Sequence, residues 1–255
     1  MLAKNQKTAV VTGASTGIGY ELAKVLAREG YQLLLVARGE ARLKKVAEEL
    51  GKAEILAVDL GKSGAAVAVH EAVKGMDVEI LVNNAGFGTY GRFLETDVES
   101  ELEMLQLNMV ALTHLTKLFV ADLAKRGGGR ILNVASTAAF QPGPGMACYF
   151  ATKAYVLSLS EALAHELKSK GITVTALCPG ATRSEFQSRA NMHSSRLVKN
   201  GMMEPSVVAE IGYRALMSGK TVVVPGYANR MLARSVGFLP RGWVTSVSAR
   251  MMDRA

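Results

Sequence analysis

The stretch "TAVVTGASTGIG" at residues 8–19 places an apolar run, a glycine-rich turn and the start of a helical pattern in direct succession. Gly13 permits a tight turn, while Gly17 and Gly19 let the backbone approach a phosphate and let the helix pack against a sheet. Free N–H groups at a helix start favour an anion. An ordinary strand-to-helix turn would show the same spacing, but its place in the first βα unit favours a phosphate-binding loop. The expected contacts are Gly13, Ser15, Thr16, Gly17, Ile18 and Gly19.

Short apolar, β-branched runs alternate with longer helical patterns along the rest of the chain. Because most of these runs are continuously apolar, they indicate strands buried on both faces. Strand and helix in repeated alternation predict an α/β class: a three-layer, doubly wound Rossmann fold with a single, mostly parallel sheet of about seven strands. No linker divides the sequence, so we expect one domain over residues 1–255. The expected strands are 8–13, 31–37, 53–59, 79–86, 129–136, 171–180 and 220–226, and the expected helices are 17–29, 40–50, 97–126 and 147–169.

The overall composition narrows the class of protein. Hydrophobic residues make up 49% and charged residues 20% of the chain, which is typical of a globular protein. We find no apolar run of the roughly 18 residues that span a bilayer, no signal-peptide pattern and only two cysteines, and we therefore expect a cytoplasmic protein. The net charge of +8 would suit an anionic ligand, a membrane surface or nucleic acid, but no nucleic-acid recognition motif is present.

Residues that follow the strand-like runs are candidate ligand contacts, because an open parallel sheet binds ligands beyond the carboxyl ends of its strands. Arg38 follows the second run, where an acidic residue would bond the ribose hydroxyls of NAD. An arginine there pairs instead with the 2′-phosphate of NADP, or it is a solvated loop charge. Asp59 ends the third run and is followed by Leu60. Asp59 would meet the adenine amino group or cap a turn.

The stretch "NNAG" at residues 83–86 ends the fourth run. Two adjacent amides can bond neighbouring loops and shape the floor of a cofactor site, so Asn83, Ala85 and Gly86 are expected cofactor contacts. The alternative is an asparagine turn, since asparagine tolerates left-handed backbone geometry. For Asn84 both interpretations stay open.

The stretch "YFATK" places Tyr149 and Lys153 four residues apart, on one face of a helix. A nearby ammonium favours the phenolate, so we expect it to lower the pKa of Tyr149 toward the range of a general acid or base. Carbonyl reduction needs such a group, because hydride reaches carbon while a proton must reach oxygen. Ser136 would hold the substrate oxygen or cap a turn. Asn108 would hold a water that relays protons to Lys153, or it would be exposed.

The sequence resembles the short-chain dehydrogenase/reductase family across nearly its whole length. The resemblance rests on "TGASTGIG", "NNAG", Asn108, Ser136, "YFATK" and the "PG" at 179–180, which stand in the order and spacing of that family. It implies that Tyr149 is the catalytic acid/base and that Ser136 orients the carbonyl. It also implies that Tyr149 contacts the cofactor, that Lys153 binds ribose and lowers the pKa of the tyrosine, and that Asn108 supports a proton relay.

The same resemblance implies a cofactor and a reaction. Pro179, Gly180 and Thr182 would contact the cofactor, with Thr182 bonded to the nicotinamide amide. Arg38 matches family members that prefer NADP (NADPH), although Thr16 stands where some of them carry a basic residue. The implied activity is hydride transfer between NADPH and a small-molecule carbonyl or alcohol, by a homodimer or homotetramer. The C-terminal tail resembles that of a subgroup acting on varied lipophilic carbonyls, so we expect an apolar substrate. A non-catalytic NADP(H)-binding sensor or scaffold and another doubly wound enzyme, such as a methyltransferase, are the alternatives; neither needs the Tyr–Lys pair.

Residues 182–205 interrupt the βα rhythm directly after the nicotinamide end of the predicted site. We expect a mobile substrate lid there, and a surface helical hairpin is the alternative. Flexible methionines suit an adaptable apolar pocket. The expected pocket residues are Phe140, Pro142, Met146, Phe186, Met192, Met202 and Met203.

Residues 227–255 alternate apolar and arginine positions at roughly helical spacing, so we expect a C-terminal helical extension that Pro240 and Gly242 split into two helices. Five arginines and one aspartate give it 5 − 1 = +4 of the net charge. It would lie on an anionic membrane surface or pack against a partner subunit, and the sequence favours packing. The histidines lack metal-ligand spacing, so no metal site is expected, and Cys148 is expected to be a packing thiol.

Overall fold

The first βα unit folds as the sequence predicts. In the computed structural model, which describes residues 6–51, 53–186 and 202–252, β1 (Lys7–Thr12) leads into a turn at Gly13 and then into α1 (Gly17–Arg28). Gly13 and Gly17 have φ of +65° and +59°, in the left-handed region that favours glycine. A Cβ on Gly19 would lie 2.3 Å from the carbonyl oxygen of Gly13, so the turn closes only around glycine.

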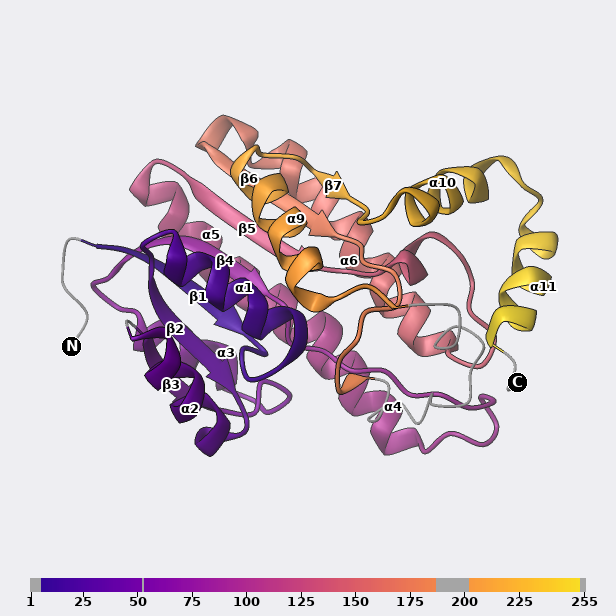
Figure 1. Cartoon of the computed structure of the whole chain (residues 1–255), viewed down its shortest axis with the longest axis horizontal. Helices are drawn as coiled ribbons and strands as arrows, with labels where there is room; N and C mark the ends of the chain where they lie inside the picture. The colour runs from indigo at the N-terminus through magenta and orange to yellow at the C-terminus, as the bar shows by residue number, and fades with distance from the viewer. Residues whose placement is uncertain (1–5, 52, 187–201, 253–255) are drawn as a thin grey trace.

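The sheet has seven strands in the order β3-β2-β1-β4-β5-β6-β7, and every neighbouring pair is parallel (Figure 1). The order reverses beside β1, which opens a crevice at the carboxyl ends of β1 and β4. This confirms the predicted doubly wound α/β class. The remaining strands are β2 (Gln32–Ala37), β3 (Ala53–Ala57), β4 (Asp77–Asn83), β5 (Gly129–Val134), β6 (Ile172–Leu177) and β7 (Val222–Val223).

Helices cover both faces of the sheet and bury two apolar cores. One core packs α1, α2 and α9 against the sheet through residues such as Leu22, Leu43 and Val208, and the other packs α3, α5 and α6 through Val69 and Phe119. The structure adds α3 and α9 to the helices expected from the sequence. The helix bounds are α2 (Glu40–Leu50), α3 (Ala65–Ala72), α4 (Val98–Leu105), α5 (Leu112–Arg126), α6 (Ala147–Glu166) and α9 (Pro205–Met217), with short 3-10 turns η2 (Thr137–Phe140) and η3 (Lys168–Lys170).

The helical stretch 98–126 contains a π-helical segment, η1 (Gln106–Ala111), between α4 and α5. A π-helix closes i→i+5 hydrogen bonds and is frequent at functional sites. This stretch of 29 residues is apolar enough to cross a membrane by length and composition, with a window of mean hydropathy 1.2. Leu115, Phe119 and Leu123 nevertheless bury its inner face against the sheet, as in a core helix of a folded domain.

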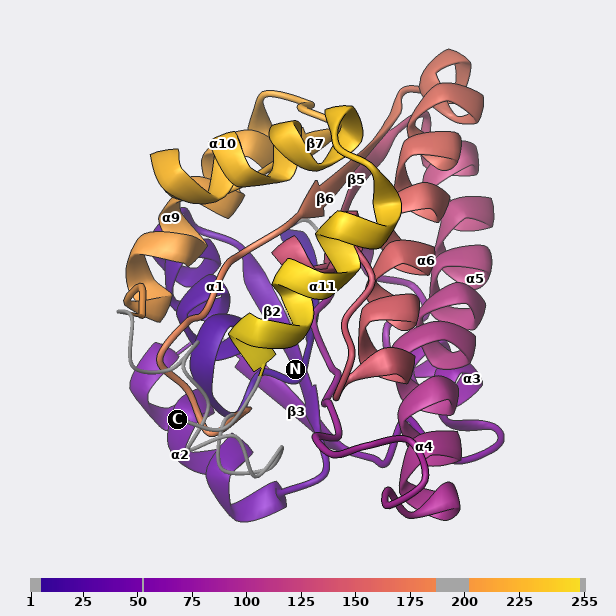
Figure 2. The same cartoon turned by 90° about the vertical axis from the view of Figure 1, so that its right-hand side faces the viewer.

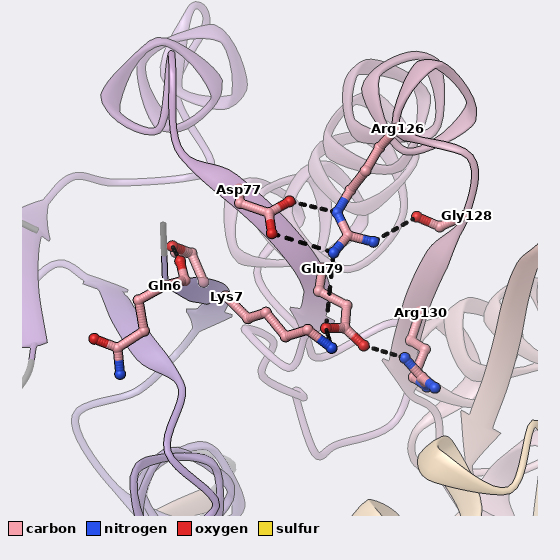
Figure 3. Close-up of polar contacts among 8 residues, drawn as sticks. Gln6, Lys7, Asp77, Glu79, Arg126, Gly128 and Arg130 are labelled. Atoms are coloured by element: carbon pink, nitrogen blue, oxygen red, sulfur yellow. Dashed lines mark hydrogen bonds and ion pairs between the residues drawn. The ribbon is translucent and has the colours of Figure 1, made fainter. Parts of the chain in front are cut away.

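An ion-pair cluster lies at the amino ends of the strands, the edge opposite the crevice (Figure 3). The carboxylate of Glu79 is buried and pairs with Lys7 at 2.8 Å and with Arg130. Arg126 pairs with Asp77 at 2.5 Å and lowers the pKa of that carboxyl through the hydrogen bond. A buried charge is tolerated only when it is paired. These ion pairs therefore explain how the charged side chain of Glu79 can be buried near the start of β4.

The C-terminal segment crosses the edge of the sheet at which the carboxyl ends of the strands lie. It forms α10 (Tyr227–Ser235), the 3-10 turn η4 (Val236–Phe238) and α11 (Arg241–Met252), separated around Pro240. Figure 2, which looks onto the right-hand side of Figure 1, shows α11 in front of the strand ends. Tyr90 fixes the end of this segment, since its hydroxyl donates to the carbonyl of Met252 at 2.5 Å.

Candidate active site

A cavity of about 1040 Å³ opens at the carboxyl ends of the strands. It extends from the glycine loop after β1 to the start of α6, and this end of the sheet is where the topology predicts ligand binding. Most of the predicted site residues line it: Gly13, Ser15, Thr16, Gly17, Ile18, Arg38, Asp59, Leu60, Ala85, Gly86, Ser136, Tyr149, Lys153, Pro179, Gly180 and Thr182.

Hydrogen bonds fix the shape of the glycine loop before any ligand binds. The Gly13 N–H donates to Val36 at 2.8 Å, which anchors the turn to β2. The Thr12 hydroxyl accepts from the N–H groups of Asn84 and Ala85 at 3.0 and 3.1 Å, and the Asn84 amide donates back to Thr12 at 2.9 Å. Asn84 thus joins the two loops and lines the cavity at the same time, which is the first of its two interpretations. The asparagine-turn interpretation stays open.

The residues at the far end of the cavity fit the 2′-phosphate of NADP. Arg38 is exposed, lines the cavity and makes no ion pair with a carboxylate in the described part of the chain. Arg42, one turn into α2, also lines the cavity and pairs with Glu185 at 2.7 Å. Guanidinium groups are well suited to phosphate. The nearby Asp59 accepts from the N–H of Gly61 at 3.0 Å, so it does cap a turn while bordering the cavity.

Tyr149 and Lys153 share one face of α6 as predicted, and both are buried at the inner end of the cavity. The Lys153 ammonium lies 5.8 Å from the centre of the Tyr149 ring and donates to the Val134 carbonyl at 2.8 Å. The expected lowering of the tyrosine pKa is wrong for this state of the protein. Burial raises the pKa of Tyr149 to about 12 and lowers the pKa of Lys153 to about 8, because it disfavours both charged forms.

Ser136 stands between the tyrosine and the strand end. Its hydroxyl accepts from the Ala138 N–H at 3.1 Å, which begins η2, so the capping interpretation holds. The same hydroxyl interacts with the Tyr149 phenol and opposes part of the rise in its pKa. An atom that touches the phenol and lines the cavity is placed to contact a substrate oxygen as well.

Three predicted residues lie behind the cavity wall. The Asn83 side chain is buried and donates hydrogen bonds to Thr116 and Asn133 at 3.0 and 2.9 Å. Successive strand residues point to opposite faces of the sheet, and the side chain of Asn83 points toward α5. The side chain therefore has a structural role and does not line the cavity, and the cofactor contact expected of Asn83 stays a prediction. Gly19 packs under the loop against Gly13. Asn108 is 1% exposed, which excludes the exposed alternative.

Asn108 sits in the π-helical segment and ties three elements together. Its amide nitrogen donates to the Phe87 carbonyl at 2.9 Å and to the Thr152 hydroxyl at 3.1 Å. Its oxygen accepts from the Phe87 N–H at 3.2 Å. A Cβ placed on Gly86 would be 2.8 Å from the Asn108 oxygen and 3.7 Å from the Lys153 nitrogen, so these groups converge on one small region. This geometry leaves the proton relay as a prediction.

Apolar side chains form the substrate end of the cavity. Met146, Phe186 and Met203 line it as predicted, and the Phe186 ring lies 5.3 Å from that of Tyr149. Among the described residues, Phe140, Pro142 and Met202 do not line it, and Met192 lies outside the described residues with most of the predicted lid. Sequence reasoning missed the wall contributed by the C-terminal segment, which consists of Asn229, Leu232, Val247, Ser248, Arg250, Met251 and Met252.

Comparison with known proteins agrees with this fold. The family model described as short chain dehydrogenase matches residues 7–195, and the chain belongs to that family of oxidoreductases. The oxidoreductase UcpA of Salmonella typhimurium is 36% identical over 188 residues, which cover 70% of each chain.

Two solved structures show how far the likeness extends. A short-chain dehydrogenase from Sphingobium yanoikuyae, solved in complex with NADPH, is 34% identical with a TM-score of 0.83, over 91% of this chain and 93% of that one. A bulky-bulky ketone specific alcohol dehydrogenase from Comamonas testosteroni is 30% identical with a TM-score of 0.78, over 92% of this chain and 94% of that one. The likeness in both therefore covers more of the chain than the family model does.

Proposed function

We propose that the protein is an NADPH-dependent carbonyl reductase that acts on bulky, apolar ketones or aldehydes, with Tyr149 as its general acid. The observation that carries this proposal is the convergence of Tyr149, Lys153 and Ser136 at one end of a cavity whose other end presents Arg38. A sensor or scaffold would need the Arg38 end of the cavity to bind the nucleotide. It would not need the catalytic groups at the other end. The NADPH complex of the Sphingobium yanoikuyae relative supports the choice of cofactor.

The proposed mechanism assigns each step to a side chain at the inner end. NADPH, when bound, supplies the hydride that reaches the carbonyl carbon. Ser136 donates a hydrogen bond to the carbonyl oxygen and holds it beside the phenol, and Tyr149 gives its proton to that oxygen as negative charge develops there. A pKa of about 12 keeps the phenol protonated at neutral pH, which suits reduction. Lys153 would stabilise the phenolate left behind and would hold the ribose of the cofactor when NADPH is bound.

The shape and chemistry of the cavity support a bulky, apolar substrate. Phe87, Met146 and Phe186 surround the Tyr149 ring, so a substrate carbonyl would approach between apolar groups. Burying an apolar group contributes about 25 cal/mol per Å² of apolar surface, which favours large hydrocarbon groups on both sides of the carbonyl. The similar alcohol dehydrogenase from Comamonas testosteroni is specific for bulky-bulky ketones, which are substrates of that kind.

The direct test is NADPH oxidation by the purified chain, followed by absorbance with a panel of carbonyls. We expect turnover with bulky ketones such as ketosteroids and aryl ketones, and much less with acetone, because a small ketone leaves the apolar cavity unfilled. NADPH binding without turnover of any carbonyl on the panel, or of the matching alcohols with NADP, would favour the sensor alternative.

Substituting Arg38→Gln tests the choice of cofactor. We expect the Kd for NADPH to rise by about 10- to 100-fold, since a hydrogen bond to a charged group contributes about 1.5–3 kcal/mol. The Kd for NADH should stay nearly unchanged, because NADH lacks the 2′-phosphate. Fluorescence titration with both nucleotides measures this, and Arg92→Gln is a matched control at an exposed arginine away from the cavity. An equal loss of both affinities would contradict the proposed phosphate contact.

A further inference from the structure

The C-terminal segment exposes large apolar side chains where most of the domain buries them. Tyr227 is 77% exposed, Phe238 is 89% exposed and Trp243 is 58% exposed, and Met231 and Leu239 lie exposed between them. Apolar side chains that gather in exposed positions on one segment indicate a candidate interaction site. We refer to these five residues, together with Arg230, Arg234 and Arg241, as the C-terminal surface.

Helical spacing gathers part of this surface onto one side of α10. Tyr227, Arg230, Met231 and Arg234 follow one another at intervals of three, one and three residues, which places them on a single face of the helix. Asn229 points the other way, because its amide donates to the Pro225 carbonyl at 3.0 Å. The outward face of α10 is therefore amphipathic along its length, with cations beside apolar groups.

All the charged side chains of the C-terminal surface are positive. Arg230, Arg234 and Arg241 make no ion pair with a carboxylate in the described part of the chain. The sequence from residue 211 to residue 252 contains no aspartate or glutamate at all. A binding partner for this surface must therefore offer negative charge together with an apolar medium.

The inner side of the same segment lines the active-site cavity. Leu232 of α10 and Val247 and Met251 of α11 contribute to the cavity wall. Figures 1 and 2 show the two helices at the open end of the sheet, away from α2 and α3. Whatever binds the outer side of this segment thus lies next to the entrance that an apolar substrate would use.

We propose that the C-terminal surface docks the protein onto an anionic lipid bilayer. Arginines complement anionic headgroups, while tyrosine and tryptophan prefer the membrane interface and Phe238 reaches the acyl region. A second copy of the chain is a poorer occupant. A two-fold symmetric interface brings the same surface of two molecules together, and here each would present three arginines and no acid. This reverses the preference for subunit packing drawn from the sequence.

The chain carries its own reporter for this proposal, because Trp243 is its one tryptophan. We expect its fluorescence to shift to the blue when vesicles of phosphatidylcholine and phosphatidylglycerol are added to the full chain. Brominated lipid should quench it, and salt should weaken the binding. Vesicles of phosphatidylcholine alone should give little change. Binding is read without substrate or NADPH, so failure here is distinguishable from failure of the proposed activity.

Substitutions separate the contributions of charge and apolar insertion. Arg230→Gln with Arg241→Gln should weaken binding to the anionic vesicles about thirtyfold, since each arginine near such a surface contributes about 1 kcal/mol. Phe238→Ser should also weaken it, while Leu94→Ser and Arg92→Gln, at exposed positions elsewhere, should not. Turnover of a water-soluble ketone should survive in all four variants.

Two results would overturn the proposal. One is a tryptophan spectrum that does not respond to anionic vesicles. The other is a spectrum that shifts with protein concentration instead, together with a dimer in sedimentation that Phe238→Ser dissociates. The second result would assign the C-terminal surface to a contact between copies of the chain.

Discussion

Substituting Tyr149→Phe is expected to lower kcat for carbonyl reduction by about 10³-fold, within the range that a positioned general acid contributes. The change removes only the phenol oxygen, so the ring keeps its contact with Phe186, 5.3 Å away between ring centres. NADPH affinity should change little, because the contacts that would hold the nucleotide come chiefly from the glycine loop, Arg38 and Lys153. Single-turnover NADPH oxidation with a bulky ketone measures the loss.

Tyr155→Phe is the matched control for that substitution. Tyr155 lies on the same helix, and its hydroxyl shares a hydrogen bond with Thr113 at 2.7 Å away from the cavity. It should keep nearly full activity. If the two variants lose activity equally, or if Tyr149→Phe keeps it, another group supplies the proton and the assignment of Tyr149 fails.

The pH profile gives the native enzyme a second readout of the same residue. Reduction needs the neutral phenol and the Lys153 cation. Burial raises the pKa of Tyr149 to about 12 and lowers the pKa of Lys153 to about 8, so the chemical step should be nearly flat up to about pH 7 and should slow as the pH rises past 8. Alcohol oxidation needs the phenolate, whose fraction rises about tenfold per pH unit below the pKa. Oxidation should therefore speed up with pH over the range in which reduction does not.

The fold could be predicted because its signals are local. The glycines at 13, 17 and 19 require a strand, a tight turn and a helix in that order, and the continuously apolar runs indicate strands buried on both faces. Asn83 and Asn84 show the limit of this reasoning. Both stand at the end of β4, but only the strand register decides that Asn83 faces α5 and that Asn84 faces the cavity.

Two features of the site depended on contacts between distant parts of the chain. The spacing of Tyr149 and Lys153 predicts a shared face, but the direction of their pKa shifts depends on burial by other elements, which no local pattern reveals. The contribution of α11 to the cavity wall depends on distant contacts such as the one between Tyr90 and Met252, which are 162 residues apart. The sequence of α11 mixes apolar, polar and charged residues, so its pattern does not predict which surface of the domain the helix will cover.

Substituting Lys153→Met is expected to give a more stable but nearly inactive protein. Lys153 is buried, and its pKa is lowered from 10.5 to about 8, so the folded state disfavours its charge at neutral pH. Methionine fills a similar volume without that charge. It also leaves the Val134 carbonyl without its donor, and this loss offsets part of the gain. We expect a net gain on the order of 2 kcal/mol in the free energy of unfolding at pH 7. We expect kcat to fall by about 10²–10³, because the phenolate loses its nearby cation.

The pH dependence of stability separates this explanation from a general packing effect. Between pH 8 and 10.5 the unfolded chain keeps a proton on Lys153 that the folded chain has released, so the native protein gains stability as the pH rises through that window. The variant lacks this group, and its advantage should shrink from pH 7 to about pH 10 in urea unfolding. Lys45→Met, at an exposed lysine of α2, should show neither effect. An advantage for Lys153→Met that stays constant with pH would contradict a burial cost on the charged lysine, and a variant that keeps its turnover would contradict the catalytic role.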